Sequence, residues 1–128
     1  MKDFVPYEQA LELDELGFDE PCFAYYNIDP QLKAPAFNMV KPFEHEWCLP
    51  APIYQQAFRW FREKYRLVQE ITVSVNGFYY IYGHFYDSNG ALRFDIRPFT
   101  GELVFFETYE EAELACLRKL ISLAQASQ

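Results

Sequence analysis

The chain is poor in the residue types that build most catalytic and metal centres, with two histidines and three cysteines among 128 residues. Cys22, Cys48 and Cys116 are odd in number and lack CxxC spacing, so they predict reduced thiols rather than a disulfide framework. No GxSxG, HExxH or glycine-rich phosphate loop occurs in the sequence. We therefore predict no catalytic residue, no cofactor and no metal, and we favour a non-enzymatic function.

Basic residues and long apolar runs are also scarce. The 11 Lys and Arg face 19 Asp and Glu, which gives a formal charge of −8. Because an acidic field repels phosphate backbones, nucleic acid is a disfavoured partner. No run approaches 18 apolar residues, and the first ten residues, MKDFVPYEQA, contain no apolar stretch of signal-peptide length. We expect a cytoplasmic protein with no membrane partner.

Aromatic residues are abundant, with 13 Phe, 10 Tyr and 2 Trp in a chain that is 51% hydrophobic. This composition excludes a disordered chain. A chain of this length buries enough surface to fold without disulfides, and no linker divides it. We predict one α+β domain that spans residues 1–128.

Three stretches have helical periodicity, and they run from about Pro6 to Leu16, Pro52 to Tyr65 and Tyr109 to Ala124. Gly17 is a natural residue to end the first. Thr108 and Glu111 have the spacing of a capping box at the start of the third, which is the best-specified helix.

Three strands are predicted over residues 68–75, 78–86 and 91–97, which are rich in β-branched and aromatic residues. Asn76-Gly77 predicts a two-residue type I′ turn between the first two, because both positions of that turn need φ > 0. This loop pairs Val75 with Phe78, Val73 with Tyr80 and Ile71 with Tyr82, and all six then share one apolar face.

The second turn, residues 87–90, can have two, three or four loop residues. A two- or four-residue loop places Arg93, Asp95 and Arg97 on the apolar face, whereas a three-residue loop with Gly90 in the left-handed conformation places Leu92, Phe94 and Ile96 there. Since a slip of one residue flips every side chain, burial favours the bulged three-residue loop.

Further strands are predicted over residues 103–107 and 22–28, with an irregular strand near Phe37–Val40. The expected fold is therefore α+β, with a twisted antiparallel sheet of about four to six strands and about three helices, mainly on one face.

Glu44, His45, Glu46 and Cys48 bring four potential metal ligands within five positions, but zinc sites usually need a distant second pair. The other histidine, His84, falls on the predicted apolar face, where a hydrogen-bonded histidine at the core margin is the ordinary interpretation. We predict no metal site from these residues.

The second face of the predicted sheet mixes polar, aromatic and charged residues. Tyr and Arg are enriched at protein–protein hot spots, so we select Tyr79, Arg93, Asp95 and Arg97 as interface candidates. The plainer interpretation is an ordinary solvated face of an antiparallel sheet.

The segment QAFRWFREKYR interleaves basic and aromatic residues, with Trp60 expected off the apolar stripe. Arg59, Trp60 and Arg62 are therefore candidates for binding single-stranded nucleic acid, by phosphate neutralisation and base stacking. A core helix with a solvated outer face is the alternative. An acidic stretch covers the end of the first helix and the residues after it, namely Glu12, Asp14, Glu15, Asp19 and Glu20. It suits a basic partner, the basic helix of the same or another copy, or a solvated face.

The stretches GFDEPCFAYY (17–26), QAFRWFREKY (56–65) and TYEEAELACLRKLI (108–121) resemble a family of small uncharacterised proteins from gut anaerobic bacteria, often found near phage-like or mobile elements. The resemblance implies a bacterial cytosolic accessory protein, and it brings no established activity, cofactor or site residue.

Three functions remain as hypotheses. The first is a non-catalytic protein-interaction module that binds an unknown protein or self-associates. The second is a nucleic-acid-associated accessory protein that acts through the helix at 52–65. The third is a small-molecule binder or an enzyme, which requires a concave pocket with convergent polar groups.

Overall fold

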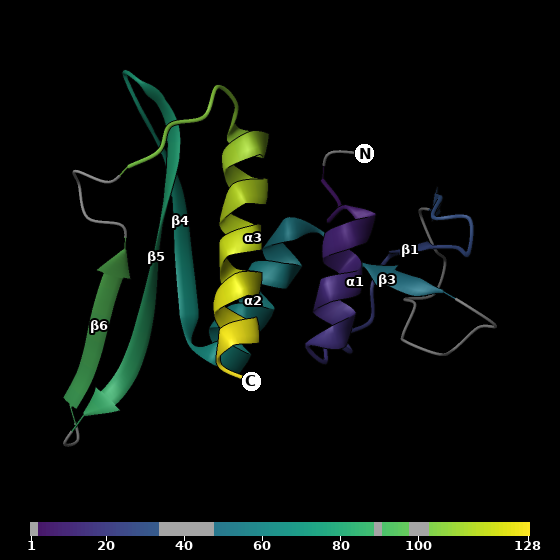
Figure 1. Cartoon of the computed structure of the whole chain (residues 1–128), viewed down its shortest axis with the longest axis horizontal. Helices are drawn as coiled ribbons and strands as arrows, with labels where there is room; N and C mark the ends of the chain where they lie inside the picture. Colours follow the sequence, from purple (N-terminus) through teal and green to yellow (C-terminus); the bar gives the residue numbers. More distant parts are fainter. Residues whose placement is uncertain (1–2, 34–47, 89–90, 98–102) are drawn as a thin grey trace. The chain divides into compact units, whose positions relative to one another are not determined.

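The computed structural model describes residues 3–33, 48–88, 91–97 and 103–128, with the backbone alone for residues 86–88 and 91–95. Within these ranges it has three helices and six strands (Figure 1), which confirms the predicted α+β class. The strands form two three-stranded antiparallel sheets rather than one. Contacts group the chain into two compact units, residues 1–57 and 58–128. The predicted strand near Phe37–Val40 lies outside the described residues.

The first unit contains helix α1 (Tyr7–Glu15) and a small sheet of order β2-β1-β3. The central strand β1 (Ala24–Tyr26) lies within the predicted range 22–28, and it pairs with β2 (Leu32–Lys33) and β3 (Leu49–Ala51). β3 is an edge strand, the place in a sheet where a proline such as Pro50 is tolerated. As predicted, Gly17 follows the helix in the left-handed region, at φ +100°.

Tyr26 connects this sheet to the segment before α1. Its hydroxyl donates a 2.7 Å hydrogen bond to the carbonyl of Val5, and its ring meets Tyr7 edge-on at 5.5 Å. Val5 in turn donates its backbone N–H to the carbonyl of Pro52 at 2.9 Å. Burial raises the pKa of the Tyr26 phenol, so the group stays neutral and keeps its donor.

The second unit contains most of helix α2 (Tyr54–Tyr65), the sheet β4-β5-β6 and helix α3 (Tyr109–Ala126). Its strands are β4 (Leu67–Ser74), β5 (Gly77–Ser88) and β6 (Ala91–Arg97). α3 runs along one face of this sheet and packs chiefly on β5 and β4 (Figure 1). The hydroxyl oxygen of Thr108 accepts a 3.1 Å hydrogen bond from the N–H of Glu111, which confirms one of the two bonds of the predicted capping box.

The turn between β4 and β5 differs from the prediction. Val73 pairs with Phe78, so Val75 and Asn76 form the loop and Gly77 begins β5 at φ +125°. Among the described residues other than glycine, Arg66 alone has a positive φ, so Asn76 does not take the type I′ conformation. The partner of Val73 shifts by two residues, and an even shift leaves the same side chains on each face.

The turn between β5 and β6 also differs, and here the faces change. Ser88 pairs with Ala91, so the loop has two residues and the predicted bulged three-residue loop is wrong. Arg97 consequently pairs with Tyr82, whereas Ile96 pairs with Gly83 on the opposite face and is 47% exposed. The physical reason is that α3 packs chiefly on β5 and β4, so burial under the helix does not select the register of the edge strand.

The predicted strand over residues 103–107 is reduced to a single bridge. Phe106 and Phe78 exchange two backbone hydrogen bonds, of 2.8 and 2.7 Å, and residues 103–105 have no strand geometry. In the part of the chain that the structure describes, no helix combines the length and the apolar character needed to cross a membrane.

Candidate functional site

The two faces of the β4-β5-β6 sheet differ in what covers them. On the α3 side, Tyr80 stacks on Phe106 at 6.4 Å and Phe78 meets Tyr109 edge-on at 6.1 Å. Burial raises the pKa of Tyr80, and the neighbouring Cys116 and Tyr82 raise it further. This side therefore carries half-buried aromatic side chains next to a helix.

The side turned away from α3 also carries partly exposed aromatic residues, and α3 does not cover them. Tyr79 meets Phe105 edge-on at 5.7 Å, and the guanidinium of Arg66 lies 5.4 Å above the ring of Phe85. Phe105 is 38% exposed and Ile96 is 47% exposed. We call the surface formed by Tyr79, Phe85, Ile96 and Phe105 the open sheet face.

The four predicted interface candidates of the sheet do not lie on one surface. Tyr79 lies on the open sheet face, as predicted. Arg97 lies on the α3 side, because the two-residue loop pairs it with Tyr82. Arg93 and Asp95 occupy the positions of β6 that alternate with Ile96, in register with Tyr86 and His84. The placement of all three on the open face is therefore wrong, whereas a role for these residues in binding stays a prediction.

The candidates on α2 are also divided. Arg59 and Arg62 are exposed, but Trp60 is only 5% exposed, so its predicted place off the apolar stripe is wrong. Trp60 meets Phe61 and Tyr65 edge-on at 5.1 and 5.6 Å, and the Lys64 ammonium lies 5.2 Å from its ring centroid. The indole is thus part of an intramolecular cluster and offers little surface on which a base could stack.

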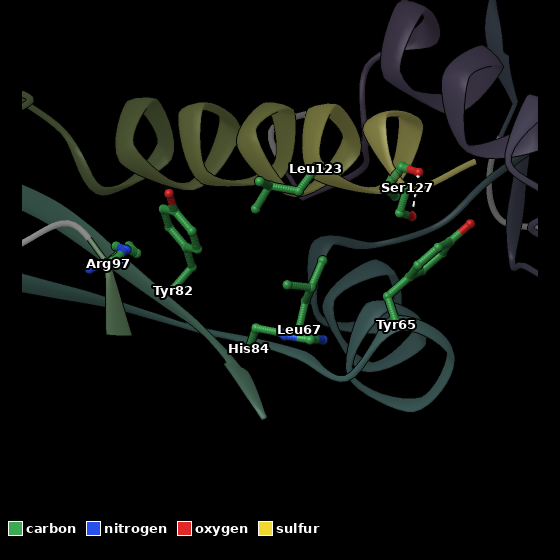
Figure 2. A pocket seen from close by; sticks show the side chains of 8 residues that line it. Tyr65, Leu67, Tyr82, His84, Arg97, Leu123 and Ser127 are labelled. Carbon is green, nitrogen blue, oxygen red and sulfur yellow. Dashed lines mark hydrogen bonds between the residues drawn. The ribbon is translucent and has the colours of Figure 1, made fainter. Parts of the chain in front are cut away.

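A partly open cleft of about 400 Å³ lies between the last turns of α3 and the sheet. Its apolar wall consists of Leu67 from β4 together with Leu123 and Ala124 from α3. In Figure 2, Leu67 and Leu123 lie between Tyr82 at one end and Tyr65 at the other. This volume falls within the usual range for small-molecule sites.

Polar groups from four elements reach the same cleft. Tyr82 and His84 come from β5 and Arg97 from β6, and Tyr65 and Ser127 lie at the ends of α2 and α3. The hydroxyl of Tyr65 accepts a 3.0 Å hydrogen bond from the Gln128 amide, and the hydroxyl of Ser127 donates to the carbonyl of Ala124 at 2.9 Å (Figure 2). A cation, an imidazole and phenol groups thus surround an apolar floor.

The sequence alone does not indicate this cleft. The predicted three-residue loop places His84 on the apolar face and Arg97 on the opposite face, and the cleft forms only when both share a face with Tyr82. The alternating charges of Arg93, Asp95 and Arg97 were the pattern that could have indicated it. Their interpretation depended on the loop length, which the sequence left open.

The cysteines have no part in the cleft. Cys22 and Cys116 are buried, and burial raises the pKa of each thiol from 9.0 to about 12, with a smaller contribution from Glu20 and Glu113 respectively. Such thiols remain protonated and unreactive. No group of three or more His, Cys, Asp or Glu suited to a metal occurs within the described ranges. Three of the four ligand candidates around residue 45 lie outside those ranges.

No family model, curated protein or solved structure matches the chain.

Proposed function

We propose that this protein is a non-catalytic interaction module of the bacterial cytosol that associates with a second copy of itself through the open sheet face. The observation that supports this function is the row of partly exposed aromatic and aliphatic side chains on a face that α3 does not cover. Apolar patches of this kind mark association surfaces in soluble proteins. Ordered aromatic pairs such as Tyr79 with Phe105 also lose little conformational entropy on binding.

The charges at the margin of this face favour a second copy over a strongly charged partner. Arg66 immediately precedes β4, and Glu70, which is exposed, lies four residues further along the chain. In a two-fold symmetric dimer, every contact between two different residues occurs twice. One basic and one acidic side chain in each copy can therefore form two ion pairs across the interface. A strongly basic or acidic partner would instead require a face of opposite charge.

The distribution of charge along the chain supports the same partner. Residues 58–128 contain 8 Lys and Arg against 9 Asp and Glu, whereas residues 1–57 contain 3 against 10. The unit that carries the open sheet face is thus almost neutral. Like-charge repulsion between two such faces is correspondingly small.

Two further observations support the cytosolic assignment. Cys22 and Cys116 are buried as separate thiols, the form that a reducing compartment maintains. The resemblance to accessory proteins of gut anaerobic bacteria agrees with it.

Analytical ultracentrifugation over a range of concentrations tests the proposal. We expect reversible dimerisation, and we expect Ile96→Lys to weaken it at least tenfold because a charge would then be desolvated within the interface. Val75→Lys is the matched control, since Val75 is a fully exposed β-branched residue in the β4–β5 loop, outside the face. A protein that stays monomeric up to about 0.5 mM, or an equal effect of both variants, would contradict the proposal.

The nucleic-acid hypothesis has less support. Arg59 and Arg62 are exposed and can neutralise phosphates, but the buried Trp60 cannot serve as a stacking platform without leaving its cluster. Salt-sensitive binding of single-stranded DNA that is lost in Arg59→Ala/Arg62→Ala would favour it over self-association.

A further inference from the structure

In a chain with a formal charge of −8, two cationic side chains lie at or near the cleft under α3. The guanidinium of Arg97 and the imidazole of His84 line it, and the ammonium of Lys119 on α3 lies 5.8 Å from the ring centroid of Tyr82. The acidic residue nearest in register is Asp95, which occupies the position opposite His84. Arg97 and Lys119 thus both lie beside Tyr82.

The rest of the cleft is suited to an apolar group. Leu67 is buried, Leu123 is half-buried, and both point into the space between Tyr82 and Tyr65 (Figure 2). Transfer of apolar surface from water to such a wall favours binding. A strongly hydrated ligand such as inorganic phosphate would gain nothing from this part of the cleft.

We propose that the cleft binds a small organic carboxylate with an aromatic or aliphatic body. Arg97 donates two parallel N–H groups to the carboxylate, the geometry that the guanidinium fork favours. The hydroxyl of Tyr82 donates a further hydrogen bond. The body of the ligand then packs between Leu67 and Leu123.

Arg97 and His84 each interact with other groups of the chain. The site lies on the opposite face of the sheet from Tyr79 and Phe105, so it does not depend on the proposed self-association.

The test uses 4-phenylbutyrate, octanoate and the neutral isostere 4-phenylbutyramide as probes, with binding followed by two-dimensional amide NMR and calorimetry on the intact chain. We expect at least one carboxylate to bind saturably with a Kd below about 1 mM, and the amide to bind at least tenfold more weakly. The shifted resonances should include those of Leu67, His84 and Leu123. Binding of neither carboxylate, equal binding of the amide, or shifts confined to other residues would overturn the proposal.

Two variants with a matched control test the assigned contacts. Arg97→Gln should weaken carboxylate binding at least tenfold, whereas Arg62→Gln removes an exposed arginine of α2 and should leave it unchanged. If Arg97→Gln disturbs the amide spectrum as a whole, Tyr82→Phe keeps the ring and removes one donor, and a loss of about threefold is expected. Unchanged affinity in the variants that fold would overturn the assignment.

Discussion

Gly77 begins β5 where the backbone of residue 106 approaches most closely. At φ +125° it occupies a conformation that other residues rarely adopt, and a Cβ built there would lie 2.6 Å from the carbonyl oxygen of Phe106. That carbonyl also accepts a 2.8 Å hydrogen bond from Phe78, so it cannot move away without loss of the bridge. We therefore expect Gly77→Ala to destabilise the protein by about 2 kcal/mol or more, measured by urea unfolding.

The neighbouring residue supplies the control for the loop assignment. In the observed turn, Asn76 has a negative φ and an exposed side chain. Asn76→Ala should therefore change the free energy of unfolding by less than about 0.5 kcal/mol. A type I′ turn would instead require Asn76 in the left-handed region, where alanine costs roughly 1 to 2 kcal/mol. A large loss in Asn76→Ala would thus show that the loop is the one predicted from the sequence.

Helix α3 depends on a side-chain cap that the sequence indicates on its own. The bond from the N–H of Glu111 to the hydroxyl oxygen of Thr108 satisfies one of the four unpaired amides at the start of the helix. Thr108→Ala should destabilise the protein by about 1 kcal/mol in thermal or urea unfolding. Thr108→Ser keeps the oxygen and should behave like the wild type. Equal losses in both variants would contradict a role for the cap.

The helices could be predicted because their determinants are local. Gly17 and Thr108 end and begin helices through backbone conformation and a short-range hydrogen bond, and neither depends on distant residues. The short strands β2 and β3 were not predicted, since two or three residues carry no periodicity and Pro50 argues against a strand unless the edge position is known.

The faces of the sheet were harder to predict, because they depend on register. For β4 and β5 the error was an even shift, so the partition of side chains between the faces survived. For β6 the loop length decides which residues lie on each face, and burial selects the three-residue loop only if one layer of helices covers all three strands. α3 packs chiefly on two of them, so Ile96 is exposed on the far face and Arg97 reaches the cleft. Tyr79 was therefore placed correctly and Arg97 was not.

At the scale of the whole molecule, the buried thiols tie stability to alkaline pH. Burial raises the pKa of Cys22 and of Cys116 from 9.0 to about 12. Between these values the unfolded chain releases both protons and the native protein keeps them, so the unfolded state binds fewer protons and the free energy of unfolding falls as pH rises. The contribution of the two protonated thiols to stability is therefore complete below about pH 9. Above that pH, each thiol should lower the free energy of unfolding by about 1 kcal/mol per pH unit.

The measurement is the free energy of unfolding from about pH 8 to about pH 10.5, for the wild type and for Cys22→Ala/Cys116→Ala. Each substitution removes a buried sulfur and lowers stability at every pH, so the comparison concerns the slope and not the absolute value. We expect the free energy of unfolding to fall less steeply with pH in the variant than in the wild type. The fall that remains in the variant is due to Tyr26 and Tyr80, whose pKa values burial also raises. Identical slopes would mean that the native protein admits solvent to both thiols, because only a hydrated thiolate could form there without cost.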